Sequence, residues 1–294
     1  MKVLVLGAGG MLGSAMFSVL SENPGLDVSG TLRTGAKQNY FLAGGGEKLL
    51  LNVDVQDLPS LRSLLDEVRP QAVINCVGVI KQLADSHDAL ISIAINSLLP
   101  HQLAELCGQV GARLVHFSTD CVFSGRQGNY AEGDFSDAED LYGRSKFLGE
   151  VSYPHALTMR TSIIGHELGS RHSLVDWFLA QTGQCNGYTE AFFSGFPSVE
   201  LARIVSEFIL PNKNLSGLYQ VAAERISKYD LLSLIAEEYD FPIKIVPSDV
   251  VKIDRSLNGS RFNAEAAYTP PDWPTLIKKM HVQFQHRNDG NVQR

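Results

Sequence analysis

The sequence predicts an α/β fold in which a doubly wound parallel sheet is joined to a smaller C-terminal lobe. Apolar runs of strand length recur along the first part of the chain, with helical patterns between them. This alternation is typical of parallel strands covered by helices on both faces. A glycine-rich turn also follows the first apolar run directly. The expected strands are Val3–Leu6, Val28–Leu32, Leu49–Val53, Ala72–Cys76, Leu114–Phe117 and Ala156–Met159.

Two helices are expected between the later strands as crossover connections. The first spans Ser86–Gly108 and the second spans Leu141–Val151. Apolar residues recur along one side of the first helix at amphipathic spacing. These residues are Leu90, Ile91, Ala94, Ile95 and Leu98.

The regular alternation stops near residue 165, where glycine, proline and aromatic residues become denser. We therefore expect a Rossmann-type domain at residues 1–165, with a return segment at about 196–225 that adds the strand Leu218–Ala222. Residues 166–195 and 226–294 are expected to form the smaller lobe. The polar tail from His286 is expected to fray.

Composition favours a cytoplasmic protein without a membrane partner. The chain has 294 residues, of which 44% are hydrophobic and 19% charged, and we find no apolar run near the ~18 residues that cross a bilayer. The first apolar stretch runs straight into glycines, so a buried strand is expected there rather than a signal peptide. The four cysteines are widely spaced, which favours reduced thiols.

Charge and spacing also exclude some partners. The net charge of −7 disfavours nucleic-acid binding, which depends on Lys and Arg against phosphates. No metal site is expected: His166, Glu167 and His172 are irregularly spaced and are interpreted as loop polarity. Trp177 and Phe178 are interpreted as core.

The glycine-rich turn predicts a dinucleotide site. Gly7, Gly10 and Gly13 follow the first strand with G-x-x-G-x-x-G spacing, and Met11 and Leu12 open the next helix. A pyrophosphate can bind at such a helix start, where backbone N–H groups and the positive end of the helix dipole meet it. An NAD(P) cofactor is therefore expected.

The end of the second strand bears on the choice between NADPH and NADH. A carboxylate there would bind the ribose 2′-hydroxyl, whereas an arginine accommodates a 2′-phosphate. Thr31 and Arg33 stand at this end without an acid, so NADPH is favoured and NADH stays possible. Further cofactor contacts are expected after the third and fourth strands, from Asp54, Val55, Cys76, Val77 and Gly78.

A tyrosine and a lysine predict acid–base chemistry. Tyr142 and Lys146 are four residues apart, hence on one helical face. A phenol with a pKa near ~10 transfers protons poorly at neutral pH unless a cation stabilises the phenolate. Thr119, at the end of the fifth strand, can direct its hydroxyl at the same substrate oxygen. These three residues are the expected catalytic set for reduction of a carbonyl.

The same stretch carries a family resemblance. Ser118–Gly125 reads STDCVFSG, Tyr142–Lys146 reads YGRSK, and Gly149 and Glu150 follow. With the glycine turn and Asn96, these motifs resemble the extended short-chain dehydrogenase/reductases, in particular the dTDP-4-dehydrorhamnose reductases of surface-polysaccharide synthesis. The resemblance covers nearly the whole chain and is most specific between residues 118 and 150.

The resemblance implies NAD(P)H-dependent reduction of the 4-keto group of a nucleotide-linked 6-deoxyhexose. It carries the catalytic roles onto Thr119, Tyr142 and Lys146, gives Lys146 a contact with the nicotinamide ribose, and assigns Asn96 to the support of Lys146. Cys121 stands where the family usually has tyrosine, at a position that faces the sugar. The substrate therefore stays open between dTDP- and UDP-linked sugars.

A nucleotide-diphosphate sugar brings about two negative charges, which this acidic chain must meet with local cations. The candidates are Lys81, Arg255 and Arg261. A homodimer is possible.

Three other functions are alternatives to that of a reductase. A 4,6-dehydratase would need a second carboxylate after Asp120, where this chain has Cys121. A nucleotide-sugar epimerase needs the same acid–base pair and a tightly held NAD. A non-catalytic NADP-binding regulatory subunit is the third, because a relative of these reductases serves an unrelated synthetase in that role.

Overall fold

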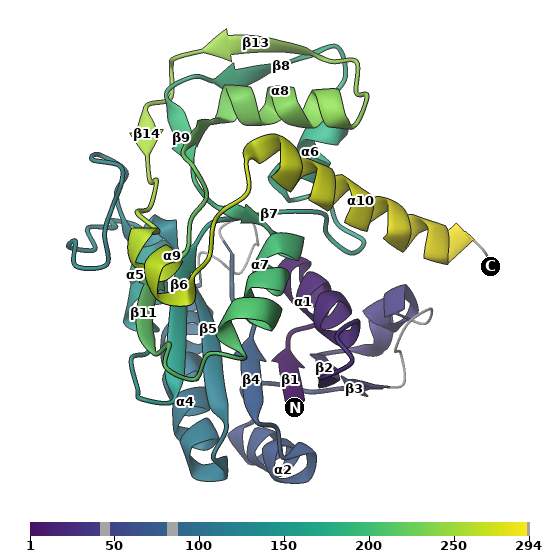
Figure 1. The fold of residues 1–294 in the computed structure, drawn as a ribbon, viewed down its shortest axis with the longest axis vertical. Helices are drawn as coiled ribbons and strands as arrows, with labels where there is room; N and C mark the ends of the chain where they lie inside the picture. The colour runs from purple at the N-terminus through teal and green to yellow at the C-terminus, as the bar shows by residue number, and fades with distance from the viewer. Residues whose placement is uncertain (42–47, 81–87, 293–294) are drawn as a thin grey trace.

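The computed structural model describes residues 1–41, 48–80 and 88–292 (Figure 1). Its centre is a seven-stranded sheet in the order β11-β6-β5-β4-β1-β2-β3, and each neighbouring pair is parallel. This confirms the predicted fold class. The strands are β1 (Lys2–Leu6), β2 (Asp27–Leu32), β3 (Leu49–Leu51), β4 (Ala72–Asn75), β5 (Arg113–Thr119), β6 (Ala156–Thr161) and β11 (Gly217–Gln220).

Both faces of the sheet are buried, as the apolar strands predict. Val3 and Val5 of β1 belong to a core cluster with α1 (Met11–Ser21) and α7 (Ser198–Ile204). Leu4 and Leu6 belong to a second cluster with α2 (Leu58–Val68) and α4 (Leu99–Val110). Alternate side chains of one strand thus serve opposite layers.

The first predicted crossover helix, Ser86–Gly108, consists of three parts, and residue 86 lies outside the described residues. They are α3 (Ala89–Ser92), a π-helical turn (Ile93–Leu98) and α4. Pro100 lacks the N–H that would bond to the carbonyl of Asn96 in an α-helix, which accounts for the wider turn. Gly149 approaches that carbonyl so closely that a side chain there would collide with it.

The run Ala89–Val110 is the one helix among the described residues with the length and mean hydropathy, 1.2, to cross a membrane. Half of it is buried inside the fold, and its residues include Leu99 and Leu103 of the second core cluster. It is a core helix of this domain. The second crossover helix, α5 (Leu141–Leu148), packs against the π-helical turn and stops before the predicted end at Val151, because Gly149 caps it.

The remaining elements form a smaller layer at the carboxyl ends of the central strands (Figure 1). Two small sheets lie in it, with orders β12-β9-β14 and β13-β8. The pair β7 (Ile163–Ile164) and β10 (Phe196–Pro197) follows β6 and precedes α7. The other elements of this layer are α6 (Leu174–Leu179), β8 (Gln184–Tyr188), β9 (Ala191–Phe193), β12 (Ile226–Ser227), α8 (Lys228–Glu238), β13 (Lys244–Ser248) and β14 (Ile253–Asp254). Helix α9 (Ser260–Ala266) packs instead against the edge strand β11.

The chain ends in a long helix, α10 (Trp273–Val292), which crosses α8 and α7 (Figure 1). The expectation that the tail frays from His286 is therefore wrong. The helix is anchored just before that point, because Phe284 stacks on His166 at 3.9 Å and His281 stacks on Tyr239 at 4.0 Å. Ring contacts between distant segments are not visible in a local polarity pattern.

Candidate active site

A cavity of about 710 Å³ lies where the carboxyl ends of β4, β5 and β6 meet the smaller layer. In doubly wound sheets this edge is where ligands bind. Its wall includes part of the glycine turn, the ends of β4 and β5, one face of α5, and residues of the C-terminal segments. It therefore brings the three predicted catalytic residues and part of the predicted cofactor residues to one space.

The glycine turn is built for close backbone approach. Gly7 has a φ of +81°, which favours glycine, and its carbonyl accepts from the Gly10 N–H at 3.1 Å. A side chain at Gly13 would collide with the Gly7 carbonyl. Gly10, Met11 and Leu12 line the cavity, so the start of α1 faces it. A dinucleotide fits this arrangement, because a helix start supplies N–H groups to a phosphate.

A cation that the sequence analysis did not identify, Lys37, lies in this part of the cavity. Lys37 lines the cavity beside the glycine turn, and its Nζ donates to the Gly9 carbonyl at 2.9 Å. The 3₁₀ turn Gly35–Phe41 carries it there. Arg33, the expected cation, is exposed and is absent from the described lining. Thr31 holds the turn instead, since its Oγ1 accepts from the Gly7 N–H at 3.1 Å.

The other expected cofactor residues divide into two groups. Cys76, Val77 and Gly78 line the cavity after β4, where Asn75 Oδ1 accepts from the Val77 N–H at 3.1 Å. Asp54 accepts from the Gln56 N–H at 3.0 Å, and Val55 is buried in the core cluster of α2 and α4. Neither Asp54 nor Val55 is part of the described lining.

Tyr142 and Lys146 both line the cavity from α5, and Thr119 lines it from the end of β5. The position of α5 is set at its start, where the N-cap Asp140 accepts from the Gly143 N–H at 2.8 Å. Gly143 lies against the Cys121 carbonyl, where a side chain would collide. This contact packs the helix on the 3₁₀ turn Asp120–Val122 that follows β5.

Lys146 is buried, and its Nζ donates to the Phe117 carbonyl at 2.6 Å. Burial lowers the pKa of Lys146 to about 8, and the charge of Glu150 opposes that fall. Burial also raises the pKa of Tyr142 above its ordinary value, and hydrogen bonding with Thr119 opposes that rise. These surroundings therefore favour the protonated phenol, the form that can act as an acid.

Asn96 joins the loop after β4 to α5. Its Oδ1 accepts from the Val79 N–H at 2.9 Å, and its Nδ2 donates to the Val79 carbonyl at 3.0 Å and to Ser145 Oγ at 3.2 Å. Asn96 thus fixes the residue that precedes Lys146. Its contacts are indirect support for the lysine rather than a direct bond to it.

A buried ion pair lies next to the end of α5. Arg160 of β6 bonds through Nε and Nη2 to the two carboxylate oxygens of Glu150, each at 2.7 Å. The side chains are only 3% and 8% exposed. Ser118 of β5 donates to the same carboxylate at 2.7 Å. The pair connects the end of α5 to two central strands.

Only some of the predicted substrate-binding residues line the cavity. Arg255 and Cys121 line the cavity, and Arg255 Nε donates to the Phe123 carbonyl at 2.7 Å. Arg261 lies on α9, pairs with Glu265 at 3.0 Å, and is absent from the described lining, so its charge is already matched. Lys81 lies outside the described residues.

Two further lining residues were missed or misread in the sequence. Lys228, which opens α8, adds a cation to the cavity. Trp177 was expected in the core, but it is 40% exposed and lines the cavity, while its neighbour Phe178 is buried. Because α6 turns by about 100° per residue, these adjacent aromatics lie on different faces of the helix, one toward the cavity and one toward the core.

His166 has a structural role. Its Nδ1 contacts Asp176 at 2.5 Å and its Nε2 contacts the Tyr239 hydroxyl at 2.9 Å. Within residues 1–41, 48–80 and 88–292, no group of three or more His, Cys, Asp or Glu residues is placed to hold a metal ion.

Comparison with known proteins identifies the family of this chain. Residues 1–280 match the model of the RmlD substrate binding domain. The chain belongs to the RmlD family. The match covers most of the sequence, including the glycine turn, α5 and the smaller layer.

Relatives of this RmlD-family chain have different descriptions. A probable low-salt glycan biosynthesis reductase of Haloferax volcanii is 33% identical over 60% of this chain and 57% of that protein. Methionine adenosyltransferase 2 subunit beta of Danio rerio is 26% identical over 82% of this chain and 75% of that protein. The first alignment thus spans little more than half of the Haloferax protein.

A solved structure shows the same fold. The dTDP-4-dehydrorhamnose reductase of Bacillus anthracis, in complex with NADP, has a TM-score of 0.77. It is 19% identical and covers 96% of this chain and 99% of its own. The arrangement of sheet and smaller layer is therefore shared with that structure.

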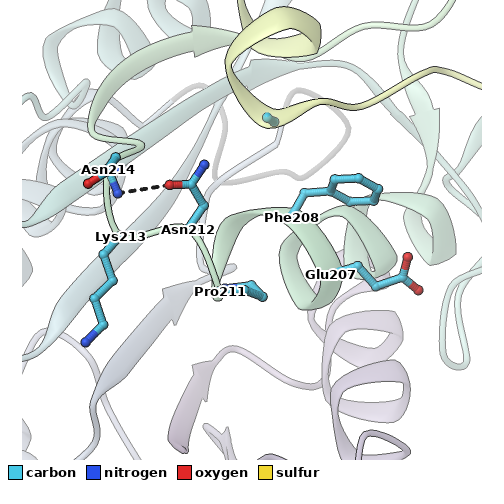
Figure 2. A pocket seen from close by; sticks show the side chains of 7 residues that line it. Glu207, Phe208, Pro211, Asn212, Lys213 and Asn214 are labelled. Carbon is cyan, nitrogen blue, oxygen red and sulfur yellow. Dashed lines mark hydrogen bonds between the residues drawn. The ribbon is translucent and has the colours of Figure 1, made fainter.

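A second hollow, of about 500 Å³, lies on the surface of this RmlD-family fold away from the cavity (Figure 2). In Figure 2 the charged ends of Glu207 and Lys213 point apart, and Asn214 N donates to Asn212 Oδ1 at 3.1 Å. The polar groups do not converge on one point, so the hollow has no feature of a reactive site. Its lining is Glu207, Phe208, Pro211, Asn212, Lys213, Asn214 and Ala266.

Proposed function

We propose that this protein is an NAD(P)H-dependent reductase of the 4-keto group of a nucleotide-linked 6-deoxyhexose. One observation carries the proposal: Thr119, Tyr142 and Lys146 line the same cavity as the glycine turn. Relatives support the substrate class, because they include a dTDP-4-dehydrorhamnose reductase of Mycobacterium tuberculosis and a probable glycan biosynthesis reductase. Whether the nucleotide is dTDP or UDP is the finer question that the experiment must answer.

The chain's own residues account for the proton. When bound, the nicotinamide supplies a hydride to the carbonyl carbon. Tyr142 gives its phenolic proton to the carbonyl oxygen, which becomes the hydroxyl. Lys146, held by the Phe117 carbonyl, stabilises the phenolate that forms. The phenol recovers its proton from solvent before the next turnover.

The catalytic set favours a reductase over a regulatory subunit. A subunit that only binds the dinucleotide needs the glycine turn and can use an ammonium at the ribose, but it has no use for a phenol beside a threonine hydroxyl in the same cavity. Burial also disfavours the charged form of Lys146, a cost that is offset in a reductase because the lysine stabilises a phenolate. Intact Thr119, Tyr142 and Lys146 therefore support catalysis.

The test is a panel of dTDP- and UDP-linked 4-keto-6-deoxy sugars with NADPH. We expect loss of the reduced-nicotinamide absorbance with one of them, and a product two hydrogen atoms heavier by mass spectrometry. An epimerase would instead show no net NADPH consumption with these keto sugars, and with NAD it would interconvert the corresponding 4-hydroxy sugars at unchanged mass. No turnover, with a synthetase copurifying in stoichiometric amount, would favour the regulatory role.

We further propose NADPH as the preferred cofactor, with Lys37 as the cation for the 2′-phosphate. Lys37→Met removes the charge and leaves an unbranched side chain of similar length. We expect it to raise the Kd for NADPH by roughly 10- to 100-fold, the affinity ratio that corresponds to losing one hydrogen bond to a charged group. The Kd for NADH should change little. Titration of each cofactor by nicotinamide fluorescence measures both constants.

Arg33→Met is the matched control for Lys37→Met, because Arg33 is a nearby exposed cation outside the described lining. It should leave both constants within about twofold. If Arg33→Met weakens NADPH selectively and Lys37→Met does not, the sequence-based assignment of Arg33 is right. Equal weakening of both cofactors by Lys37→Met would remove the 2′-phosphate argument.

A further inference from the structure

Asp120 is a buried carboxyl group that the mechanism above does not use. It opens the 3₁₀ turn after β5, lines the cavity and is only 8% exposed. Thr119 Oγ1 donates to Asp120 Oδ1 at 3.1 Å, while the Cys121 N–H donates to the same threonine oxygen at 3.1 Å. The acid is therefore bonded directly to a residue of the proposed catalytic set.

The threonine hydroxyl has a single proton. An ionised carboxylate can only accept a hydrogen bond, so the proton between the two groups must come from Thr119 while Asp120 is charged. A hydrogen bond to a charged acceptor is about twice as strong as a neutral one. With Asp120 ionised, the Thr119 proton is directed away from the neutral acceptors in the cavity, which are the phenol oxygen of Tyr142 and a substrate carbonyl.

Protonation of Asp120 reverses this direction. The carboxylic acid then has a proton of its own to donate to Thr119 Oγ1, and the threonine proton is released toward the cavity. Thr119 and Tyr142 can then both donate to one carbonyl oxygen, on which negative charge develops as the hydride arrives.

We propose that Asp120 is a positioning residue that sets the direction of the Thr119 proton, so that Thr119 assists reduction only while Asp120 is neutral. This inference rests on the proposed reductase activity. It assigns no bond-breaking step to Asp120, which acts through Thr119 alone.

The surroundings of Asp120 connect this switch to substrate binding. Burial raises the pKa of Asp120, and the charge of Arg255 opposes that rise, with hydrogen bonds from Cys121, Thr119 and Ser162. The titratable groups of α5 that line the same cavity as Asp120 are Tyr142 and Lys146. A diphosphate that binds Arg255 neutralises the charge that favours the carboxylate. Binding of the nucleotide end would thus favour neutral Asp120 at the keto end.

The sign of the pH dependence follows. Asp120 is neutral below its raised pKa, so the assistance of Thr119 is present at low pH and is lost as pH rises through that pKa. Asp120→Asn is permanently uncharged and can still donate to Thr119 through its amide. We expect the fall of kcat at high pH to begin at a higher pH in Asp120→Asn than in the wild type, with kcat at low pH retained within a few-fold.

Asp137→Asn is the control, because Asp137 is a nearby acid bonded to Ser124 and is outside the described lining of the cavity. It should keep the wild-type profile. The proposal is overturned if kcat falls at the same pH in the wild type and in Asp120→Asn. It is also overturned if Asp120→Asn is inactive at every pH while circular dichroism shows it folded.

A measurement on the wild type tests the coupling without turnover. Infrared difference spectra are recorded as UDP or dTDP is added to the NADPH complex, with and without carbon-13 aspartate labelling. We expect a protonated carboxyl band to appear and to shift with the label. Absence of that band overturns the coupling, whereas failure of every keto sugar in the panel would overturn the proposed function and leave the infrared result standing.

Discussion

Replacing Tyr142 by phenylalanine should lower kcat by about 10²- to 10⁴-fold, the range that a positioned proton donor contributes. The substitution removes one oxygen and keeps the ring that fills the cavity wall. Because Lys146 and the glycine turn are unchanged, NADPH should bind with nearly its wild-type Kd. Steady-state rates with the accepted sugar and fluorescence titration of NADPH measure the two quantities separately.

The control for Tyr142→Phe is Tyr153→Phe. Tyr153 follows the same helix but is 43% exposed, and its hydroxyl contacts His101 at 3.3 Å outside the described lining of the cavity. Its loss should change kcat by less than about twofold, as for other exposed positions. A Tyr142→Phe variant that turns over at the wild-type rate would show that the proton comes from another group.

The result also separates the rival functions. An epimerase uses the same phenol and should lose activity in Tyr142→Phe as well, so the two are distinguished by net NADPH consumption rather than by the variant. A regulatory subunit should show no dependence on Tyr142 in any assay of its partner. Only a reductase combines stoichiometric NADPH oxidation with loss of turnover in this variant.

The central strands were predictable because their signal is local. Apolar runs buried on both faces are continuous in sequence, and the predicted Val28–Leu32 lies within the observed Asp27–Leu32. The third strand is shorter than predicted, ending at Leu51 rather than Val53. Asn52 has a φ of 60°, a left-handed conformation that ends the extended run.

The parts that sequence reasoning missed depend on contacts between distant segments. Lys37 reaches the glycine turn because a 3₁₀ turn folds back over Gly9, and no periodicity encodes that return. Arg33 stands closer to the strand end, yet its side chain is exposed. Lys228 likewise lines the cavity from α8 of the smaller layer, far along the chain from α5. A possible clue was the position of Lys37 shortly after the second strand.

Replacing Glu150 by alanine should lower the free energy of unfolding by about 3–5 kcal/mol. The guanidinium of Arg160 would be left charged, 3% exposed and without its carboxylate, and Ser118 would lose its acceptor. Nη1 of Arg160 already has no hydrogen-bond partner within the described residues, so the remaining contacts cannot satisfy the group. Urea unfolding of the protein without cofactor measures the change.

Glu139→Ala is the matched control, because Glu139 pairs with Arg126 at 2.6 Å on the surface, where the two side chains are 72% and 75% exposed. An exposed pair contributes about 0–1 kcal/mol, so this variant should unfold at nearly the wild-type urea concentration. If both variants lose the same stability, burial of the Arg160 charge is not the cause. Adding Arg160→Met to Glu150→Ala should restore part of the loss, since removing both charges costs less than isolating one in the interior.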